Sequence, residues 1–499
     1  MSREVFSGFL WSAWGKGART VLQFVVLIVL ARLMTPHEFG VVGAATIVIG
    51  FAEIFTHIGL GPAIVQRTEL RPEHVRTAFS ASIVMSVLIA ILIWVLAPKI
   101  AHFFNYEGIE SVLRTLILLF PIKGLGLVPE SLAQRGLKFK QLANAETASF
   151  AVGYFVVGVP LALLDFGVWA LVAANLVAAT LVTTILFVKF PVRGLMPTRK
   201  AFGELIYFGG GYTIARIANY IALQVDYVVV GRAMGLTALG LYGRAYQLMS
   251  VPASAFGQVL DAVLFPSMAK IQDEKERLAA IYLRGVSLIA MVMMPASAGA
   301  FLLAPEIVEV LLGPEWGDVV LPFQILVLGL LARTSYKLSD SLTRARGAVY
   351  SRALRQIVYG AFVFGGAYIG RRWGVEGVAC GVLLAVTLNF LLMAEMSLKI
   401  LGVKWSSFAT AHSTAFVYSV GTAAFTYLSA TALRSLDLSP LVLLLLIGTA
   451  LLGIAAAAFK IAPTGLLGDE ARWAVQFLRS YGRSSFTPES GLGASGTTG

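Results

Sequence analysis

Long apolar stretches separated by short polar connections make up almost the whole chain, and this pattern limits what it can fold into. Fourteen stretches approach or exceed the roughly 20 residues that a membrane-spanning helix needs. They lie at residues 8–32, 39–66, 76–97, 111–134, 141–164, 167–189, 203–231, 238–266, 281–303, 319–343, 352–371, 375–399, 407–430 and 440–460. Runs such as Val21–Leu30 are apolar on every side, whereas membrane strands alternate polar and apolar residues. The sequence therefore predicts an all-α polytopic membrane protein.

Charged residues are scarce and unevenly placed. They make up 13% of the chain, against about 25% in soluble domains. If the N-terminus is cytoplasmic, 27 of the 39 lysines and arginines fall in cytoplasmic segments. Seven fall on the opposite side, namely Arg32, Lys99, Arg114, Arg232, Arg371, Arg372 and Arg434. Because cytoplasmic connections are enriched in lysine and arginine, we expect both termini in the cytoplasm and an even number of helices.

A repeat with an offset of about 200 residues divides the chain. The tetrad ARLM at 31–34, followed by Gly40, recurs as GRAM at 231–234, followed by Gly240. Six helices are an even number, so both copies enter the membrane from the same side and form parallel repeats that can rock around a central cavity. The expected units are two six-helix bundles at 1–199 and 200–404, an extra helix pair at 405–460, and a cytoplasmic, partly disordered tail at 461–499.

Six short segments are distinctive in combination: ARLMTPHEFG at 31–40, GLGPAIVQR at 59–67, LAQRGLKFK at 132–140, DYVVVGR at 226–232, GLY at 240–242 and LFPSM at 264–268. Together they resemble the polysaccharide-transport (Wzx-type) family, in the superfamily that also holds the MATE drug exporters and the lipid II flippases. The resemblance covers residues 5–460 and is greatest to the colanic-acid and teichuronic-acid exporters.

This resemblance implies a flippase of the bacterial inner membrane. The implied substrate is an undecaprenyl-pyrophosphate-linked oligosaccharide repeat unit, moved to the periplasmic leaflet for exopolysaccharide, capsule or O-antigen (lipopolysaccharide) synthesis. A polysaccharide polymerase and chain-length or export proteins are the implied partners.

Cations inside the predicted helices are the candidate substrate-binding residues. A charge at membrane depth costs several kcal/mol unless it faces a cavity or a partner. Guanidinium groups can replace the hydration of a pyrophosphate and bind its oxygens in a bidentate fork. The candidates are Arg216, Arg244, Arg333, Lys337 and Lys123. The alternatives are that Arg216 pairs with an acid on a neighbouring helix and that Arg244 lies near a helix end and reaches toward water.

Four further residues are candidates for ion coupling: Asp226, Glu53, His57 and Asp261. Glu53 and His57 are four residues apart and so share a helical face, and histidine titrates near neutral pH. The alternatives are that Asp226 neutralises a nearby arginine and that Glu53 and His57 form an interhelical hydrogen bond.

A glycine triplet is the candidate hinge. Gly209, Gly210 and Gly211 remove three successive side chains inside the seventh span, where a helix can bend or another can approach closely. The alternative is that glycine is simply common in membrane helices.

Other function classes find little support. The chain has no phosphate-binding loop of the GxxxxGK[ST] type, no HExxH zinc motif and no GxSxG elbow. The single cysteine, Cys380, excludes an intrachain disulfide and a cysteine-built metal site. We therefore expect no enzyme activity and no cofactor. An ion-coupled multidrug exporter, the main alternative, requires an acidic cavity, and a membrane polymerase or ligase usually has a large periplasmic loop.

Overall fold

The computed structural model describes residues 17, 19–57, 59–192, 194–195, 198–271, 273–345 and 349–461, and in these ranges the fold is helical without a strand. Nine helical segments among them are long and apolar enough to cross a membrane, or ten if the bent pair Pro314–Val327 and Leu330–Thr343 forms one span. The segment Leu354–Leu401 itself contains two helices. An all-α membrane fold is confirmed, and the helix count is consistent with fourteen.

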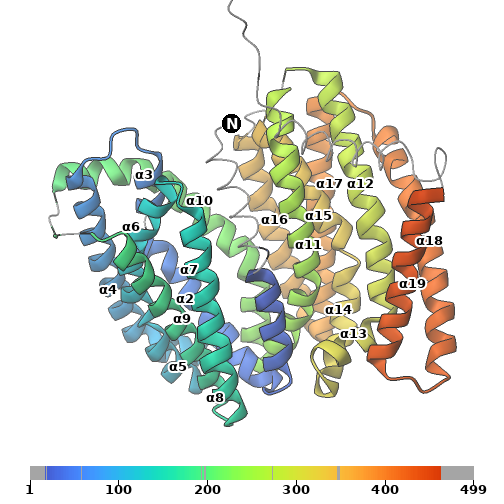
Figure 1. Ribbon diagram of the computed structural model, residues 1–499, viewed down its shortest axis with the longest axis horizontal. Coiled ribbons are helices and arrows are strands. Elements are labelled where there is room, and N and C mark those ends of the chain that lie inside the picture. Colours follow the sequence, from blue (N-terminus) through green and yellow to red (C-terminus); the bar gives the residue numbers. More distant parts are fainter. Residues whose placement is uncertain are drawn as a thin grey trace, which may run out of the picture.

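The first group of helices is the N-terminal half (Figure 1). It comprises the helix Arg19–Ala31, α2 (Pro36–His57), α3 (Leu60–Gln66), α4 (Pro72–Phe103), α5 (Gly108–Leu116), α6 (Leu119–Arg135), α7 (Phe139–Ala151), the π-helical turn η1 (Val152–Gly158), α8 (Val159–Leu163) and α9 (Val168–Lys189).

The second group is the C-terminal half, which lies beside the first (Figure 1). It comprises α10 (Arg199–Met234), α11 (Leu236–Lys270), α12 (Lys275–Leu302), α13 (Ala304–Leu311), η2 (Pro314–Val319), α14 (Val320–Val327), α15 (Leu330–Ala345), α16 (Val349–Gly370), η3 (Arg371–Trp373) and α17 (Gly374–Leu401). A last pair, α18 (Trp405–Arg434) and α19 (Pro440–Ile461), packs on α12 and α13 at the edge of this half.

The helices expose apolar side chains outward, as a lipid-facing surface requires. In α4, Val84, Leu88, Ile91 and Val95 are each more than half exposed. Their spacing of three and four residues places them on one helical face. Water would penalise such a stripe, whereas the hydrocarbon core of a bilayer accommodates it. The protein is therefore a multi-pass membrane protein.

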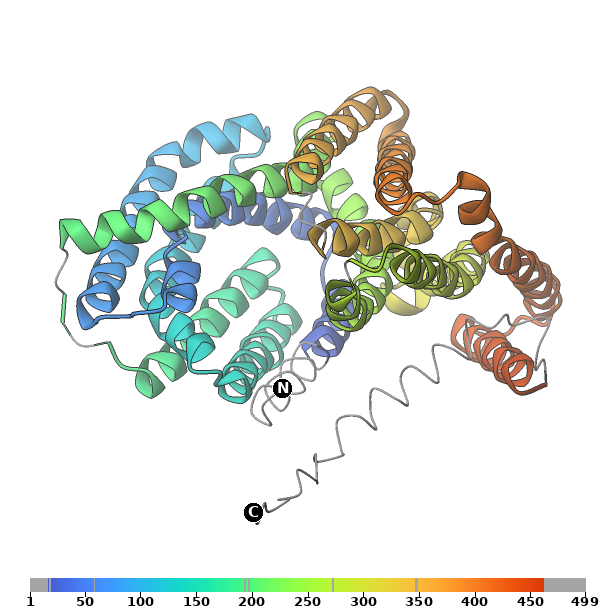
Figure 2. The ribbon, with the colours of Figure 1, turned by 90° about the horizontal axis from the view of Figure 1, so that it is seen from above.

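The helix α10 connects the two halves. It contacts α2, α3 and α4 of the first half and α11 and α16 of the second, and Figure 2 shows it running alongside both groups. It is helical without a break through Gly209, Gly210 and Gly211. A hinge at this triplet therefore remains a prediction, as do the unit boundaries at 199/200 and 404/405.

The connections between helices lie at two opposite ends of the molecule, which we call the basic end and the far end. The basic end carries connections such as 67–71, 136–138 and 402–404, and the far end carries connections such as 104–107, 164–167 and 435–439. The turn between α18 and α19 marks the far end, at the bottom of Figure 1.

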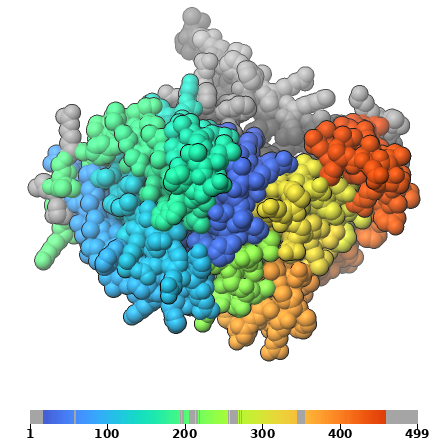
Figure 3. Space-filling view, turned by 90° about the horizontal axis from the view of Figure 1, so that it is seen from below, coloured from blue at the N-terminus to red at the C-terminus, as the bar shows by residue number. Residues whose placement is uncertain are grey.

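The two halves meet closely at the far end, where α2 and α11 begin. A methyl group added at Gly40 would overlap the carbonyl oxygen of Leu236, and one at Gly240 would overlap that of Pro36. His37 Nδ1 and Thr237 Oγ1, 200 residues apart, are 3.4 Å from each other. Figure 3 shows this first part of the chain against the start of the second half on the lower face. Only glycine permits two backbones to approach in this way.

Candidate functional site

Three tyrosines and an aspartate form a cluster inside the C-terminal half. Tyr242 Oη donates a 2.6 Å hydrogen bond to Asp226 Oδ2, and both residues are buried. The ring centroid of Tyr227 lies 5.2 Å from that of Tyr242 and 5.4 Å from that of Tyr246. Asp226 and Tyr227 come from α10, whereas the other two come from α11, so the cluster joins these helices.

Arg333 on α15 caps this tyrosine cluster. Its guanidinium carbon lies 4.5 Å from the ring centroid of Tyr246, and its Nη2 donates a hydrogen bond to Tyr246 Oη. No carboxylate of the described residues lies within ion-pair distance of it, and Asp226 interacts with it electrostatically at longer range. A guanidinium has five N–H donors in a planar fork, so Arg333 retains donors for the oxygens of an anion.

Arg244 lies beside the cluster and reaches the N-terminal half. Its guanidinium carbon is 4.3 Å from the ring centroid of Phe39, which belongs to α2. Its Nε is buried and has no hydrogen-bond partner among the described residues. Tyr227 is close enough to interact electrostatically with both Arg244 and Arg333. The structure therefore brings two of the five predicted cations around one set of tyrosines.

The other predicted cations lie elsewhere. Lys337, four residues after Arg333 on α15, donates a 3.2 Å hydrogen bond to the carbonyl oxygen of Ala253. Arg216 is exposed on α10. Lys123 Nζ lies 2.7 Å from Glu53 Oε2 in an ion pair between α6 and α2.

The Lys123–Glu53 pair joins two residues that the sequence assigned to different roles, substrate binding and ion coupling. Asp226 accepts a hydrogen bond from Tyr242 and also interacts electrostatically with Arg333, which agrees with the alternative that it neutralises a nearby arginine. The side chains of His57 and Asp261 lie outside the described parts of the chain, so both assignments stay predictions.

The sequence analysis did not single out the residues that contact the predicted site residues, or Arg135 at the basic end. Tyr227 and Phe39 complete the surroundings of Arg244, and their signal was their place in the DYVVVGR and ARLMTPHEFG segments. At the basic end, Arg135 donates hydrogen bonds to the carbonyl oxygens of Ile64 at 2.8 Å and Thr68 at 3.2 Å. It thereby ties α6 to the end of α3. The signal was present, because Arg135 stands inside the LAQRGLKFK segment.

The described residues contain no group of three or more histidine, cysteine, aspartate or glutamate side chains placed to hold a metal ion. The polar chemistry of the site is therefore that of arginine, tyrosine and a buried carboxyl group. Arginine forks bind planar or tetrahedral anions, and phenol hydroxyls and rings contact sugars or cations.

Comparison with solved structures supports the fold. The lipid II flippase MurJ in its inward closed conformation superimposes with a TM-score of 0.73 over 90% of this chain and 98% of the flippase, at 13% sequence identity. At that identity the likeness concerns the arrangement of helices.

Two curated relatives carry names from polysaccharide synthesis. The chain is 25% identical to the lipopolysaccharide biosynthesis protein WzxC of Escherichia coli over 435 residues, which is 86% of this chain and 88% of that one. It is 30% identical to the succinoglycan biosynthesis transport protein ExoT of Rhizobium meliloti over 324 residues, 64% of each chain. The resemblance inferred from the six segments is confirmed.

The sequence model of one family matches residues 29–321, more than half of the chain. This region contains the Gly40–Gly240 contact, the tyrosine cluster and Arg244, and it ends before Arg333. The protein belongs to the family of polysaccharide biosynthesis proteins described by that model.

Proposed function

We propose that this protein moves an undecaprenyl-pyrophosphate-linked oligosaccharide unit across the bacterial inner membrane by alternating access of its two halves. It serves the synthesis of an exopolysaccharide, capsule or O-antigen. In this proposal the basic end and both chain termini face the cytoplasm, and the chain has no catalytic activity of its own.

One observation supports an anionic substrate above the others. Arg333 lies at membrane depth, half-buried, against Tyr246 and without an ion pair to a described carboxylate. An arginine in this position is costly unless an anion or water compensates it. A pyrophosphate supplies oxygens on two adjacent phosphoryl groups, which suit a guanidinium fork.

Arg244 supports the same substrate from the interface between the halves. It belongs to the C-terminal half yet lies over Phe39 of the N-terminal half. Movement of the halves would change its surroundings, and a cation whose surroundings change during transport can bind its ligand more strongly in one state than in another. The tyrosines beside it offer surfaces for sugars. The relatives named for lipopolysaccharide synthesis and succinoglycan transport agree with this substrate class.

Asp226 is the residue we propose for ion coupling. One of its carboxylate oxygens accepts the hydrogen bond from Tyr242, and the other is buried without a hydrogen-bond partner in the described parts of the chain. In this proposal the oxygen without a partner, Oδ1, takes up and releases the coupled proton. Glu53 already has Lys123 as a partner, which makes it the weaker candidate.

The test is complementation of a strain that lacks its own flippase. The readouts are surface polysaccharide and the lipid-linked precursor that remains in the cytoplasmic leaflet. Wild type should restore polymer, whereas Arg333→Gln should accumulate precursor and reduce polymer about tenfold or more. The matched control is Arg277→Gln, because Arg277 is an exposed cation that forms an exposed pair with Glu274 at 3.2 Å. This control should behave like wild type.

Full polymer from Arg333→Gln at wild-type protein level would remove the anion-binding role of Arg333. If wild type itself leaves both polymer and precursor unchanged, the substrate class is wrong. The alternative is then an ion-coupled exporter of cationic amphiphiles, to be tested by drug efflux.

A further inference from the structure

Three arginines gather at the far end, at the junction of the two halves. Arg232 lies in the last turn of α10, and Arg371 and Arg372 begin the turn η3 after α16. Together with Asn105 and Ala233 they line an open cavity of about 550 Å³. All three arginines are exposed, and Asn105 belongs to the N-terminal half. A cluster of cations here runs against the general scarcity of lysine and arginine on this side of the membrane.

Three other far-end cations, Arg32, Arg114 and Arg434, already have partners. Arg114 Nη2 lies 2.8 Å from Glu110 Oε1, and Arg434 Nε lies 2.7 Å from Glu306 Oε1. Arg32 donates a 2.6 Å hydrogen bond to the carbonyl oxygen of Val310.

The clustered arginines differ from these. The guanidinium carbon of Arg232 lies 5.5 Å from the ring centroid of Phe103, and that of Arg371 lies 3.8 Å from the ring centroid of Tyr368. Among the described residues, no carboxylate forms an ion pair with Arg232, Arg371 or Arg372. Three neighbouring guanidinium groups repel one another unless an anion lies between them.

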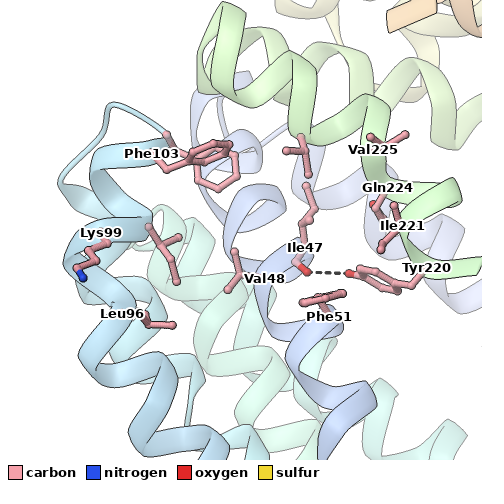
Figure 4. Close-up of a pocket in the computed structure, with 13 residues that line it drawn as sticks. Ile47, Val48, Phe51, Leu96, Lys99, Phe103, Tyr220, Ile221, Gln224 and Val225 are labelled. Atoms are coloured by element: carbon pink, nitrogen blue, oxygen red, sulfur yellow. Dashed lines mark hydrogen bonds between the residues drawn. The ribbon is translucent and has the colours of Figure 1, made fainter. Parts of the chain in front are cut away.

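An apolar groove begins beside this cluster. It has a volume of about 450 Å³ and runs between α2 and α4 of the N-terminal half and α10 of the C-terminal half (Figure 4). Its lining residues are Ile47, Val48, Phe51, Leu96, Lys99, Ile100, Phe103, Phe104, Tyr220, Ile221, Gln224, Val225 and Val228. The Tyr220 hydroxyl is already bonded to the carbonyl oxygen of Ile47 at 2.8 Å. From Tyr220 to Val228 the groove follows α10 for about 12 Å.

Phe103 joins the groove to the arginines. Its ring lines the groove and also lies against the guanidinium of Arg232. The neighbouring Phe104 packs tightly on α10, because a methyl group added at Gly231 would lie 2.9 Å from its ring. Lys99 is exposed on the same side of the groove. The groove is therefore apolar along its length and cationic at its far end.

We infer that this junction is an exit site for the transported lipid. The pyrophosphate of the lipid-linked product binds Arg232, Arg371 and Arg372 in the far leaflet, and the first isoprenoid units of its chain lie in the groove. A pyrophosphate matches three guanidinium groups better than a single phosphodiester does, because it has two phosphoryl groups to accept their forks. This inference rests on the proposed function.

The width of the exit site should also change during transport. Its walls come from both halves, so its width depends on how the halves are arranged. A ligand that binds at such a junction has a different affinity in each state of the cycle. This dependence lets the product bind at the far leaflet after crossing and leave when the halves move.

The experiment measures lipid binding to the purified full-length chain in phosphatidylcholine nanodiscs, with undecaprenyl pyrophosphate as the probe and native mass spectrometry as the readout. Wild type should bind two equivalents, one at the Arg333 site and one at the exit site. Arg371→Gln combined with Arg372→Gln should lose one equivalent, with an affinity at least about tenfold lower. The control is Arg114→Gln with Arg277→Gln, which removes two charges that already have acidic partners and should retain both equivalents.

Two further arms identify the ligand. Val225→Trp should fill the groove and weaken the binding of undecaprenyl pyrophosphate, while inorganic pyrophosphate competes at the arginines as before. Undecaprenol, which lacks the pyrophosphate, should not compete. If phosphatidylglycerol competes as well as undecaprenyl pyrophosphate does, the cluster binds anionic membrane lipid in general and the inference is wrong.

The outcomes also separate this inference from the proposed function. If wild type binds the probe and the Arg371→Gln, Arg372→Gln variant binds it equally, only the exit site is refuted. If wild type binds no undecaprenyl pyrophosphate at either site, the proposed substrate and the exit site fall together.

Discussion

Arg32 and Arg232 occupy the same position in the two copies of the repeat, 200 residues apart, yet their surroundings differ. Arg32 donates a hydrogen bond to Val310, and the cavity of about 490 Å³ that it lines also contains Glu309 and Glu315. Arg232 lies among Arg371, Arg372 and Asn105 instead. In the first copy the arginine fixes one half to the other; in the second it adds to a positive cluster.

The same contrast holds at membrane depth. Lys123 of the N-terminal half is neutralised by Glu53 at 2.7 Å. Arg333 of the C-terminal half has a tyrosine hydroxyl as its partner. The two halves therefore differ in what balances their cations. We attribute anion handling to the C-terminal half, since a cation paired with a carboxylate has little affinity left for a phosphate.

The largest expected effect concerns the close backbone contact between the halves, to which each half contributes a glycine, Gly40 or Gly240. Gly40→Ala and Gly240→Ala each place a methyl group against a backbone carbonyl of the other half. Backbone atoms cannot move aside as a flexible side chain can, so the far end should no longer close. We expect transport to fall by more than about tenfold in both variants and by similar factors, measured as precursor accumulation.

Closure itself is measurable with a cysteine pair. His37→Cys with Thr237→Cys, in a Cys380→Ala background, should crosslink in the wild-type arrangement and lose crosslinking when Gly40→Ala is added. The control is Gly365→Ala, because a methyl group there meets no atom within 4 Å. Normal crosslinking and normal transport in both glycine variants would show that this contact is not the far-end seal.

The next effect contrasts the intramembrane cations. Arg333→Gln should reduce transport about tenfold or more and should lower stability less than Lys123→Gln does, since it removes a hydrogen bond to Tyr246 but no ion pair. Lys123→Gln should instead lower stability by about 1–3 kcal/mol, because Glu53 loses its ion-pair partner in a low-dielectric setting. Chemical denaturation in detergent and precursor assays on the same preparations measure both quantities.

A double variant distinguishes the two roles. Glu53→Gln with Lys123→Gln replaces the ion pair by two neutral amides and should recover most of the stability that Lys123→Gln loses. Recovery of transport with it identifies the pair as structural. If the double variant is stable but inactive, Lys123 or Glu53 takes part in transport, and the contrast between the halves fails.

The sequence was sufficient to predict the helices, the repeat and the depth of the cations, but not the partners that distinguish the two halves. Apolar runs predicted the helices because a bilayer imposes their length and composition. The repeat was visible since glycines such as Gly40 and Gly240 tolerate no replacement at a close backbone contact. The depth of Arg244 and Arg333 also followed from the sequence, because charges interrupt apolar stretches conspicuously.

Partners could not be predicted, because they come from helices distant in sequence. Lys123 and Glu53 are 70 residues apart, and Arg244 meets Phe39 across the junction of the halves. The gathering of Arg232 with Arg371 and Arg372 depends on where α10 and α16 end. A charge count places these residues on one side of the membrane but cannot show that they lie together.

A smaller effect concerns the buried pair of Asp226 and Tyr242. At the same 200-residue offset, the first copy has Val26 and Val42, both buried. Tyr242→Phe should cost about 1–3 kcal/mol, because Asp226 loses its hydrogen-bond donor. Asp226→Leu with Tyr242→Phe should be more stable than Tyr242→Phe alone, since the repeat already accommodates an apolar pair there. Unfolding in detergent measures the difference, and a double variant less stable than the single one would show that the offset does not relate the two environments.

The smallest expected effect separates the two equivalent arginines by stability alone. Arg32→Gln removes the hydrogen bond to Val310 and should lower stability by about 1 kcal/mol, because Arg32 is exposed and water replaces part of the loss. Arg232→Gln removes no ion pair and should stay within about 0.5 kcal/mol of wild type. It should even gain slightly at low salt, since one of three repelling charges is gone. Thermal unfolding of both variants at low and high salt measures this, and equal destabilisation by the two substitutions would mean that Arg232 is held as firmly as Arg32 and is not kept available for an anion.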